Sequence, residues 1–349
     1  MPLGHQSSTL RVFILGAGAS VFAGYPLAND LLAFLRRYPL SDDLKASAAS
    51  DIFWKLGRAA TALERITNNK DLNLEILLTQ LEIYKSIGSL HAVHVDWTQE
   101  DLMKLTRVIT EQFLWYQNKI DQKFWRAGVR DFEIGIDPVR VVRVAEAWGE
   151  LVQPGDILIS FNWDLLHEAI FWRAKKWSYV DGYGFAIQDA GDLEPRSYTQ
   201  ILKPHGSVNW MQDSERDETP EIEFADHFFW RGTSPAREYP PKKSLDQGRK
   251  LILPTYLKDI SKNTCLLRVW GLAQAAIRTA TEIYVIGYSL NPADHTARLL
   301  LGTGLRGNVR IDKISVIGRS PGYWPDFLVG LGKKILPVEK TFEEWVLGT

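Results

Sequence analysis

The sequence predicts an α/β fold in which a parallel sheet is flanked by helices, with a helical insertion after the first βα unit. Short apolar, β-branched runs alternate with stretches of helical periodicity, which is typical of βαβ units. Four apolar runs end in a polar or glycine-rich tip: Gly16–Ser20, Phe161–Asp164, Lys203–Ser207 and Ile286–Leu290. In an open parallel sheet, ligands bind at the edge where the carboxyl ends of the strands meet. The four tips are therefore expected to form a single site.

The first βα unit is followed by a long helical stretch. Leu10–Leu15 predicts a strand, and after the glycines the apolar residues of Val21–Leu35 recur at helical spacing. A second strand should follow closely in a plain doubly wound fold, but none is expected before Asp156. Further helices are predicted at 41–66, 72–87, 99–120 and 138–151. We therefore interpret residues 38–151 as a helical insertion or subdomain.

The α/β alternation returns at Asp156. Strands are predicted at 157–161, 201–203, 251–253, 282–286, 313–317 and near Ile335. Helices are predicted at 164–175, 264–280 and 292–301, with one more before the last strand. Residues 211–250 are polar and irregular, so we interpret them as a solvated insertion or lid. Residues 10–37 and 152–349 are expected to form one α/β domain.

The composition is that of an ordinary globular protein. Hydrophobic residues make up 45% of the 349 residues, and the formal net charge is −1, which provides no global attraction to nucleic acid or to an acidic membrane. No stretch approaches the roughly 20 apolar residues of a membrane span. The polar segment Met1–Thr9 lacks a signal-peptide hydrophobic region. The simplest expectation is a cytoplasmic protein that does not bind nucleic acid or membranes directly.

The sequence offers no clear metal site. Cys265 is the single cysteine, which excludes an internal disulfide and a cysteine-based zinc site. Its apolar neighbours predict a buried, inert thiol. His91 and His94 stand at helical spacing, but no third ligand is evident near them, so solvated helix residues are favoured over a metal pair.

The tip Gly16-Ala17-Gly18 stands between a predicted strand and a predicted helix, as in dinucleotide-binding turns. Small residues let the backbone approach phosphates, and a helix N-terminus offers N–H groups to them. Val21 replaces the third glycine of the usual Gly-x-Gly-x-x-Gly pattern, and no acidic residue follows at a second strand end. These departures argue against an ordinary dinucleotide-dependent dehydrogenase. A glycine turn required only for packing is the alternative.

Asn162, Asp164 and His205 are the candidate catalytic residues at the strand ends. An amide both donates and accepts hydrogen bonds, so Asn162 is suited to hold ribose hydroxyls or to orient a water molecule. An unperturbed imidazole titrates near neutrality, so His205 is suited to act as a base. Each has a simpler alternative, because Asn and Asp are favoured helix caps and a loop histidine can have ordinary hydrogen bonds.

Two further strand ends supply small or polar residues. Gly287 allows close approach to the backbone, and Ser289 is suited to bind a ribose or phosphate oxygen. The next strand ends at Val316-Ile-Gly-Arg319, a turn placed to meet an adenosine.

Together these motifs resemble the NAD-binding domain of the sirtuins. Sirtuins have Gly-Ala-Gly-x-Ser, Ala-Gly-Ile-Pro, Gln-Asn-x-Asp, His-Gly and Gly-Thr-Ser-Leu in this order. The matching segments here are Gly16-Ala-Gly-Ala-Ser20, Ala23-Gly-Tyr-Pro26, Asn162-Trp-Asp164, His205-Gly206 and Gly287-Tyr-Ser-Leu290. Longer forms such as Lys203-Pro-His-Gly-Ser-Val-Asn-Trp210 are more similar to the bacterial sirtuin-like proteins of antiphage defence, which cleave NAD. The resemblance covers Val12–Tyr25 and most of Asp156–Ser320, and it implies a Rossmann-like sheet.

The resemblance implies an NAD site at the strand ends. Asn162 would hold the nicotinamide ribose and the attacking water beside Asp164, and His205 would act as the base. The residues implied to hold the pyrophosphate and the adenosine half are Gly16, Ala17, Gly18, Ser20, Gly287, Ser289 and Arg319.

Two departures from the sirtuin pattern bear on the reaction. One cysteine cannot build the four-cysteine zinc module of deacylating sirtuins, and Leu27-Ala-Asn29 replaces the Asp-Phe-Arg that follows Ile-Pro in them. Both argue against a peptide-binding deacylase and favour water as the acceptor. The resemblance therefore predicts an NAD glycohydrolase without a metal, which produces nicotinamide and ADP-ribose as an effector of bacterial antiphage defence.

Such an activity has to stay off until infection, so a homo-oligomer and a separate sensor or regulator protein are expected. Two alternatives stay open. One is a module that binds NAD or ADP-ribose without turnover, and the other is a sirtuin-type ADP-ribosyltransferase or deacylase.

Overall fold

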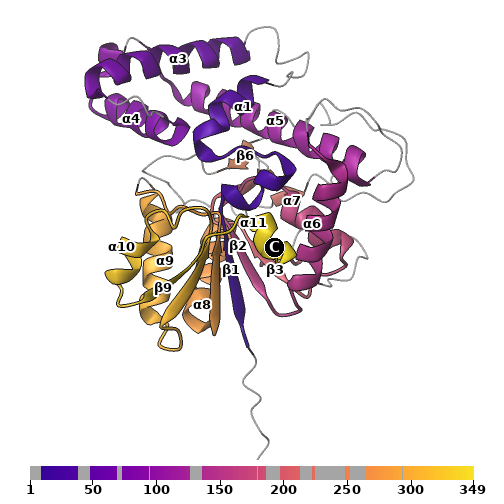
Figure 1. Ribbon diagram of the computed structural model, residues 1–349. Coiled ribbons are helices and arrows are strands. Elements are labelled where there is room, and N and C mark those ends of the chain that lie inside the picture. Colours follow the sequence, from indigo (N-terminus) through magenta and orange to yellow (C-terminus); the bar gives the residue numbers. More distant parts are fainter. Residues whose placement is uncertain are drawn as a thin grey trace, which may run out of the picture.

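A six-stranded parallel sheet with the order β3-β2-β1-β7-β8-β9 forms the centre of the molecule (Figure 1). The computed structural model describes residues 9–37, 48–68, 73–93, 95–125, 136–178, 180–185, 197–212, 222–224, 248–251, 264–292 and 294–349. The strands are β1 (Arg11–Leu15), β2 (Ile157–Ser160), β3 (Gln200–Leu202), β7 (Glu282–Ile286), β8 (Lys313–Ile317) and β9 (Lys334–Val338). The β-branched and aliphatic residues of β1, β2, β7 and β8 favour extended backbone and suit burial on both faces.

The strand order is that of a doubly wound nucleotide-binding sheet. From β1 the chain moves outward through β2 and β3, and it later returns to β7, which pairs with the other side of β1. It then continues outward through β8 and β9. The junction between β1 and β7 is the switch point, outside which ligands bind in such sheets. The predicted α/β class, with a Rossmann-like parallel sheet flanked by helices, is confirmed.

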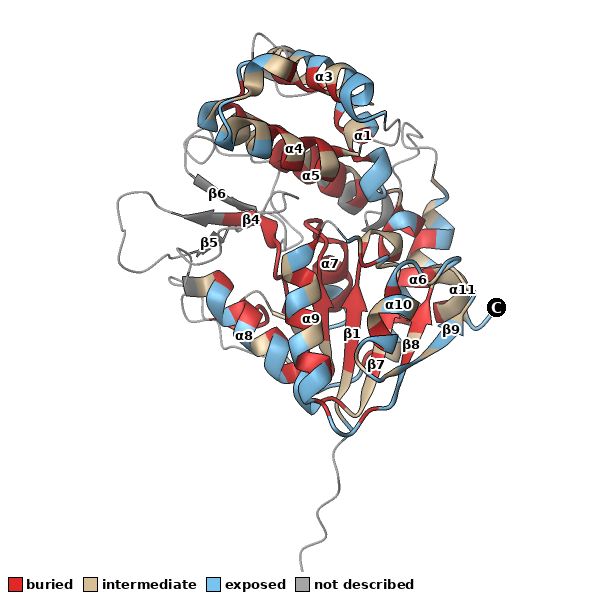
Figure 2. Ribbon diagram, turned by 90° about the vertical axis from the view of Figure 1, so that its left-hand side faces the viewer, coloured by how far each residue is buried: buried red, intermediate tan, exposed pale blue. Residues whose placement is uncertain are grey.

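Helices cover both faces of the sheet (Figure 1). One face carries α6 (Pro138–Leu151), α7 (Leu166–Arg173) and α11 (Phe342–Leu347). The other carries α8 (Thr264–Thr279), α9 (His295–Gly307) and α10 (Trp324–Val329). Figure 2 shows the central strand β1 mainly buried and the outer faces of α8 and α9 exposed, while the residues of the edge strand β9 are half-buried or exposed. None of the helices in the described part of the chain has both the length and the apolar character needed to cross a membrane.

A second group of helices lies above the carboxyl edge of the sheet in both ribbon views. It consists of α1 (Leu31–Arg37), α3 (Ala48–Thr67), α4 (Leu74–Ser86) and α5 (Gln99–Trp125). The helix α6 belongs instead to the layer on the sheet, where Trp148 packs edge-on against Phe13 of β1, with ring centroids 5.3 Å apart. The helical subdomain at residues 38–151 remains a proposal, and α6 is the part of that range that joins the sheet layer.

The helix predicted over Val21–Leu35 is wrong in its first part. Short 3₁₀ turns occupy Ala17–Ala19, Val21–Ala23 and Ala28–Asp30, and the α-helix begins only at Leu31. Gly24 adopts a left-handed conformation with φ of 82°, and Pro26 disfavours a helical Tyr25. A Cβ on Gly24 would lie 2.1 Å from the Tyr116 hydroxyl of α5. The tight turn thus follows from packing against α5.

A small antiparallel sheet follows His205 and was not predicted. Its order is β5-β4-β6, with β4 (Gly206–Gln212), β5 (Ile222–Phe224) and β6 (Gly248–Leu251). The irregular segment predicted at 211–250 is therefore wrong at these strands. The strand predicted at 251–253 meets β6 only at Leu251, which pairs antiparallel with Gly206, and residues 252–253 lie outside the described chain.

Smaller differences concern single residues. His91 lies in a 3₁₀ turn (Leu90–Val93), which removes the α-helical spacing expected with His94, and His94 lies outside the described residues. Cys265 is half-buried at the start of α8, not buried. The helix predicted at 292–301 begins at His295, because the Asp294 side chain caps it by accepting from the Ala297 N–H.

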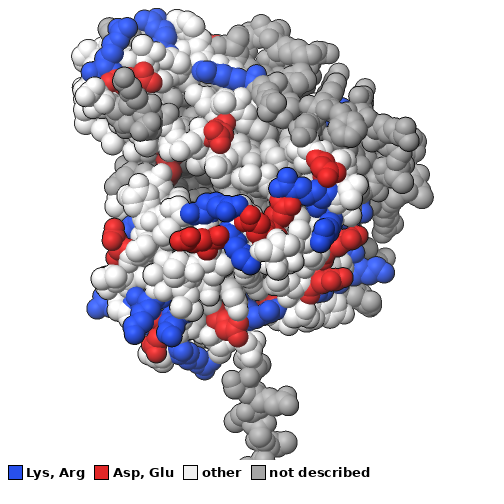
Figure 3. Space-filling view, in the orientation of Figure 1, with Lys and Arg blue, Asp and Glu red and all other residues white. Residues whose placement is uncertain are grey.

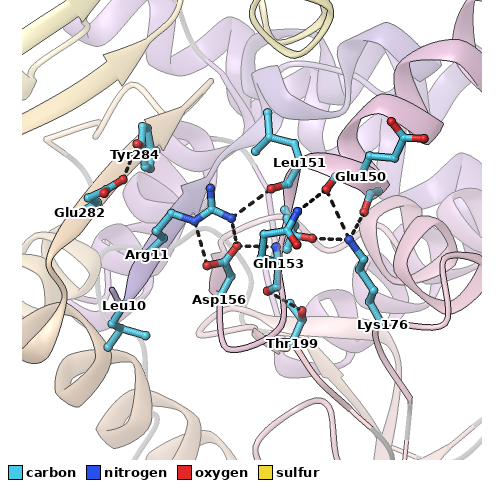
Figure 4. Close-up of polar contacts among 12 residues, drawn as sticks. Leu10, Arg11, Glu150, Leu151, Gln153, Asp156, Lys176, Thr199, Glu282 and Tyr284 are labelled. Carbon is cyan, nitrogen blue, oxygen red and sulfur yellow. Dashed lines mark hydrogen bonds and ion pairs between the residues drawn. The ribbon is translucent and has the colours of Figure 1, made fainter. Parts of the chain in front are cut away.

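An ion-pair cluster ties the amino ends of β1 and β2 to the end of α6 (Figure 4). The Arg11 guanidinium binds the Asp156 carboxylate and donates to the Leu151 carbonyl at 3.0 Å. The Lys176 ammonium donates to the Gly149 and Val152 carbonyls, which lie at the end of α6. This cluster lies at the edge of the sheet opposite the strand tips, so it serves the fold and not the site.

Candidate functional site

A cavity of about 380 Å³ lies at the carboxyl ends of the strands, beneath the upper helices. Its volume falls in the range of small-molecule sites. All four predicted tips contribute to its wall, and the remainder comes from the turn at Tyr25–Asn29, from α1, α4 and α5, and from Asn291 and Asp294 before α9. The tip residues that line it are Gly16, Ala17, Phe161, Asn162, Trp163, Asp164, His205, Gly287, Tyr288 and Ser289.

The glycines allow the ends of β1 and β7 to approach each other at the switch point. The Gly18 N–H donates to the Gly287 carbonyl at 2.9 Å, and the Gly16 N–H donates to the Ile286 carbonyl at 3.0 Å. A Cβ on Gly18 would lie 2.7 Å from the Gly287 Cα, and one on Gly16 would lie 2.6 Å from the Tyr288 Cα. Packing therefore requires these glycines, while Gly16, Ala17 and Gly287 also border the cavity.

Asn162 is held in place by the turn after β1. Its Nδ2 donates to the Gly16 carbonyl at 2.9 Å and to the Ser20 hydroxyl at 3.1 Å. Both amide protons are thereby used, so Oδ1 is the atom left to accept a hydrogen bond in the cavity. Ser20 is fully buried, does not line the cavity, and is also hydrogen-bonded to Asp164. Its place in the structure is to position Asn162 and Asp164.

Asp164 serves as a helix cap and lines the cavity at the same time. Its Oδ1 accepts from the Leu166 N–H at 3.1 Å at the start of α7. Burial raises the pKa of Asp164 to about 6, although the nearby Lys203 ammonium opposes the shift. The capping alternative is therefore observed, and the catalytic role of Asp164 stays a proposal.

His205 is paired with Asp294, a partner that the sequence did not reveal. The His205 Nε2 lies 3.2 Å from the Asp294 Oδ2, which also accepts from the Tyr288 hydroxyl at 3.1 Å. Asp294 stands at the N-terminus of α9, where the helix dipole favours a negative charge. The Phe161 ring packs on the rings of both residues that contact Asp294. Its centroid lies 4.9 Å from that of His205 and 4.5 Å from that of Tyr288. The imidazole is thus oriented by a carboxylate and by an aromatic wall.

The upper helices reach the site through Glu75, which lies in the first turn of α4. Its Oε2 accepts from the Asn291 Nδ2 at 3.3 Å, and both side chains line the cavity. No motif pointed to Glu75, because its neighbour Asn291 belongs to a distant strand end. The sequence signal available for Asp294 was its position as a capping residue before an apolar helical run.

The cavity is acidic. The ionisable residues among its described lining are Glu75, Asp164, His205, Asp294 and two tyrosines, Tyr25 and Tyr288, and this lining includes no Lys or Arg. The outer surface differs, because Figure 3 shows basic and acidic side chains interspersed over the visible face. The interior is therefore suited to a neutral or positively charged group.

Three predicted binding residues lie apart from the cavity wall. Gly18 packs on Gly287, and Ser20 is buried beneath Asn162. Arg319 is exposed, and its Nη2 binds the Glu344 Oε1 of α11 at 2.6 Å. Within the described ranges, no group of three or more His, Cys, Asp or Glu side chains is arranged to hold a metal ion.

Comparison with known proteins yields only distant likenesses. No protein-family model and no curated protein matches the sequence. A structure solved to explain the mechanism and regulation of Sir2 enzymes is similar over 98% of this chain and 90% of that chain, with 14% identity and a TM-score of 0.39. A structure addressing sirtuin substrate affinity is similar over 98% of this chain and 93% of that chain, with 12% identity and a TM-score of 0.38. Superposition at this level is loose and does not assign the chain to a family.

Proposed function

We propose that the chain binds NAD in this cavity and hydrolyses the bond between nicotinamide and ribose. The observation that carries the proposal is that Asn162 and the His205–Asp294 pair line one acidic cavity at the switch point of a parallel sheet. The motifs at these positions resemble those of sirtuins, which use NAD.

The acidity of the cavity suits the nicotinamide end of this substrate, whose pyrophosphate has to lie away from the carboxylates. The nicotinamide ring of NAD carries a positive charge, and the ribose C1′ gains positive charge as the glycosidic bond breaks. The carboxylates of Glu75, Asp164 and Asp294 line the space without a basic side chain among the described lining residues. Negative charge held close to C1′ lowers the barrier, because it stabilises the developing sugar cation more than the cationic nicotinamide ring of the bound substrate.

Hydrolysis requires the C1′–N bond to break and a water molecule to lose a proton. The electron pair of the C1′–N bond leaves with nicotinamide, and a water molecule adds to C1′ and gives up a proton. Asp294 accepts from the His205 Nε2–H, which selects the tautomer with the basic lone pair on Nδ1, and this nitrogen takes the proton. The Asn162 Oδ1 accepts from the water or from a ribose hydroxyl. The products are nicotinamide, ADP-ribose and a proton that passes to solvent.

The remainder of NAD is proposed to lie along the strand tips. Gly16, Ala17 and Gly287 border the cavity with backbone that a pyrophosphate can approach, and Ser289 lies exposed at its rim toward the adenosine half. For Arg319 to bind the ligand, its guanidinium has to release the Glu344 carboxylate.

Product analysis tests the proposal directly. The purified chain is incubated with NAD, and the products are separated by chromatography. Wild type is expected to release nicotinamide and ADP-ribose, and His205→Ala or Asn162→Ala to slow release by about 100-fold or more, as expected for loss of a positioned acid–base or water-binding group. Asp294→Asn keeps a capping side chain on α9 but loses the charge, so an intermediate rate is expected.

The matched control is His91→Ala, because His91 is exposed in a 3₁₀ turn outside the cavity lining. It should hydrolyse NAD at the wild-type rate. A wild-type rate in His205→Ala would refute the base assignment. Tight NAD binding by wild type without products would favour the binding module, and ADP-ribose attached to a protein would favour a transferase.

We also propose a biological setting for this activity. It is bacterial antiphage defence in the cytoplasm, with a homo-oligomer and a separate sensor protein that restrain NAD hydrolysis until infection. The support is the resemblance of Lys203–Trp210 and the other motifs to the sirtuin-like defence proteins that cleave NAD. An activity that depletes NAD harms its own cell unless it is restrained.

A further inference from the structure

Beneath the cavity lies a fully buried ion pair between Lys203 and Glu168. The Lys203 Nζ lies 2.7 Å from the Glu168 Oε1, and their side chains are 0% and 1% exposed. The ammonium also donates to the Asp164 carbonyl at 2.6 Å and to the Trp163 carbonyl at 3.4 Å. All three donors of the ammonium are thereby satisfied, which a buried cation requires.

These contacts join the two loops that carry the proposed catalytic groups. Trp163 and Asp164 directly follow Asn162 after β2, while Lys203 stands two residues before His205 at the end of β3. The two strands are neighbours in the sheet, but their pairing ends before the loops begin. The Lys203 side chain therefore continues the connection between the strands into the site.

Further polar contacts hold the far end of the pair. Glu168 lies in the first turn of α7, and its Oε1 accepts from the Tyr183 hydroxyl at 3.3 Å. The Asn209 Nδ2 of β4 donates to the same hydroxyl at 3.1 Å. Glu168 is thus held by its place in α7 and by the hydrogen bond from Tyr183, which β4 holds through Asn209. The Lys203 ammonium bound to Glu168 therefore has little freedom to move.

We propose that Lys203 is a positioning residue, which uses its ion pair with Glu168 to hold the Asn162 loop and the His205 loop at a fixed separation. Buried ion pairs contribute little net stability, so a geometric role explains the presence of this one better than a stabilising role. The inference rests on the proposed function in one respect: hydrolysis requires Asn162 and His205 to act on the same water and ribose.

The test is Lys203→Met, which keeps most of the length of the unbranched side chain and removes the charge and the donors. The kcat for NAD hydrolysis is expected to fall by about 100-fold, the size of effect produced by a misplacement of about 1 Å in a catalytic group. The KM should change far less, because the cavity walls that bind NAD remain. Glu168→Gln leaves an oxygen for Lys203 to bind and should retain more activity than Lys203→Met.

Arg11→Met provides the matched control. It breaks the ion pair with Asp156, which joins the starts of the neighbouring strands β1 and β2 at the edge of the sheet opposite the site. It should lower the stability and leave kcat unchanged. An equal loss of kcat in Arg11→Met would show that any loss of stability damages the site, and it would overturn the proposal.

A second readout needs no turnover. The NMR signals of the His205 imidazole, identified by their absence in His205→Ala, should shift in Lys203→Met and stay in place in Arg11→Met. Folded Lys203→Met with unshifted His205 signals would overturn the positioning role. If Lys203→Met does not fold, the double variant Lys203→Met with Glu168→Met, which leaves no unpaired charge buried, is measured in the same way, and unshifted His205 signals in it would overturn the proposal. A wild type that leaves NAD intact would refute the proposed function, and the NMR comparison would still decide the role of Lys203.

Discussion

Asp164 combines a helix-capping role with a place in the wall of the cavity. It caps α7, receives a hydrogen bond from Ser20 and lines the acidic cavity. Burial raises the pKa of Asp164 from 3.8 to about 6. A shift of this size corresponds to about 3 kcal/mol that the fold loses when the carboxylate is charged at neutral pH. Because the charged carboxylate destabilises the fold and lies in a cavity proposed to bind a cation, we expect Asp164 to be present for binding or catalysis.

This raised pKa predicts how stability changes with pH. The folded chain holds the Asp164 proton more tightly than the unfolded chain does. The protonated side chain therefore stabilises the fold below about pH 4, and this stabilisation is lost as the pH rises through about 6. Asp164→Asn has no proton to lose and keeps an acceptor for the Leu166 N–H. Its free energy of unfolding, relative to wild type, should increase by up to about 3 kcal/mol between pH 4 and pH 7. Urea denaturation at both pH values measures this difference, and an equal difference at both would contradict the prediction.

At the scale of elements, the contact between the ends of β1 and β7 determines the floor of the site. The Gly18 N–H binds the Gly287 carbonyl, and Gly287 itself has a left-handed backbone with φ of 59°. The turns after these two strands touch through backbone atoms. The pyrophosphate position proposed at Gly16 and Gly287 depends on this contact.

Substitution of glycine by alanine at two positions tests this contact. In Gly18→Ala the new Cβ would lie 2.7 Å from the Gly287 Cα, so backbone has to move, and we expect a loss of about 1–3 kcal/mol of stability and a loss of NAD hydrolysis. In Gly271→Ala, within α8, the new Cβ would meet nothing within 4 Å. Alanine favours the helix, so this variant should gain about 0.5–1 kcal/mol and keep its activity.

Denaturant unfolding and the NAD assay on both variants decide the point. If Gly18→Ala were as stable and as active as wild type, the close approach of the two turns would not matter to the site.

At the scale of the whole molecule, the cavity lies between two layers, the edge of the parallel sheet and the upper helices. The sheet edge supplies the proposed catalytic groups, and the upper helices supply Glu75 on α4 and Phe113 on α5. Hydrogen bonds join the layers, because the Tyr116 hydroxyl of α5 donates to the Ala23 carbonyl and Asn291 donates to Glu75. A ligand in the cavity contacts both layers and should stabilise them together.

NAD is therefore expected to stabilise the whole chain. His205→Ala, which should not consume NAD, is measured with and without it. At a concentration of 100 times the Kd, the free energy of unfolding should increase by about 2.7 kcal/mol. Hydrogen exchange should slow both at the strand tips and in the first turn of α4. If exchange slowed only at the strand tips, the bound NAD would not contact the upper helices, and the prediction would be wrong.

Much of the fold was predictable because its signals are local. Apolar runs that end in glycine or a polar residue mark the strands β1, β2, β7 and β8, and helical periodicity marks α4, α6 and α8. The errors arose where packing overrode local preference. The turn at Gly24 fits against Tyr116 of α5, so a helical pattern is interrupted, and β4 forms because β5 and β6 pair with it.

Residue type and spacing along the chain were sufficient to predict the α/β class, the four strand tips and the candidates Asn162, Asp164 and His205. Which side chains are paired in space depended on the packing of the whole chain. The pairs His205–Asp294, Lys203–Glu168 and Glu75–Asn291 join distant parts of the chain, and the places of Ser20 and Arg319 depend on the same packing. Such pairs are created by the strand order and by the helices above the sheet, and no local pattern in a single sequence encodes them.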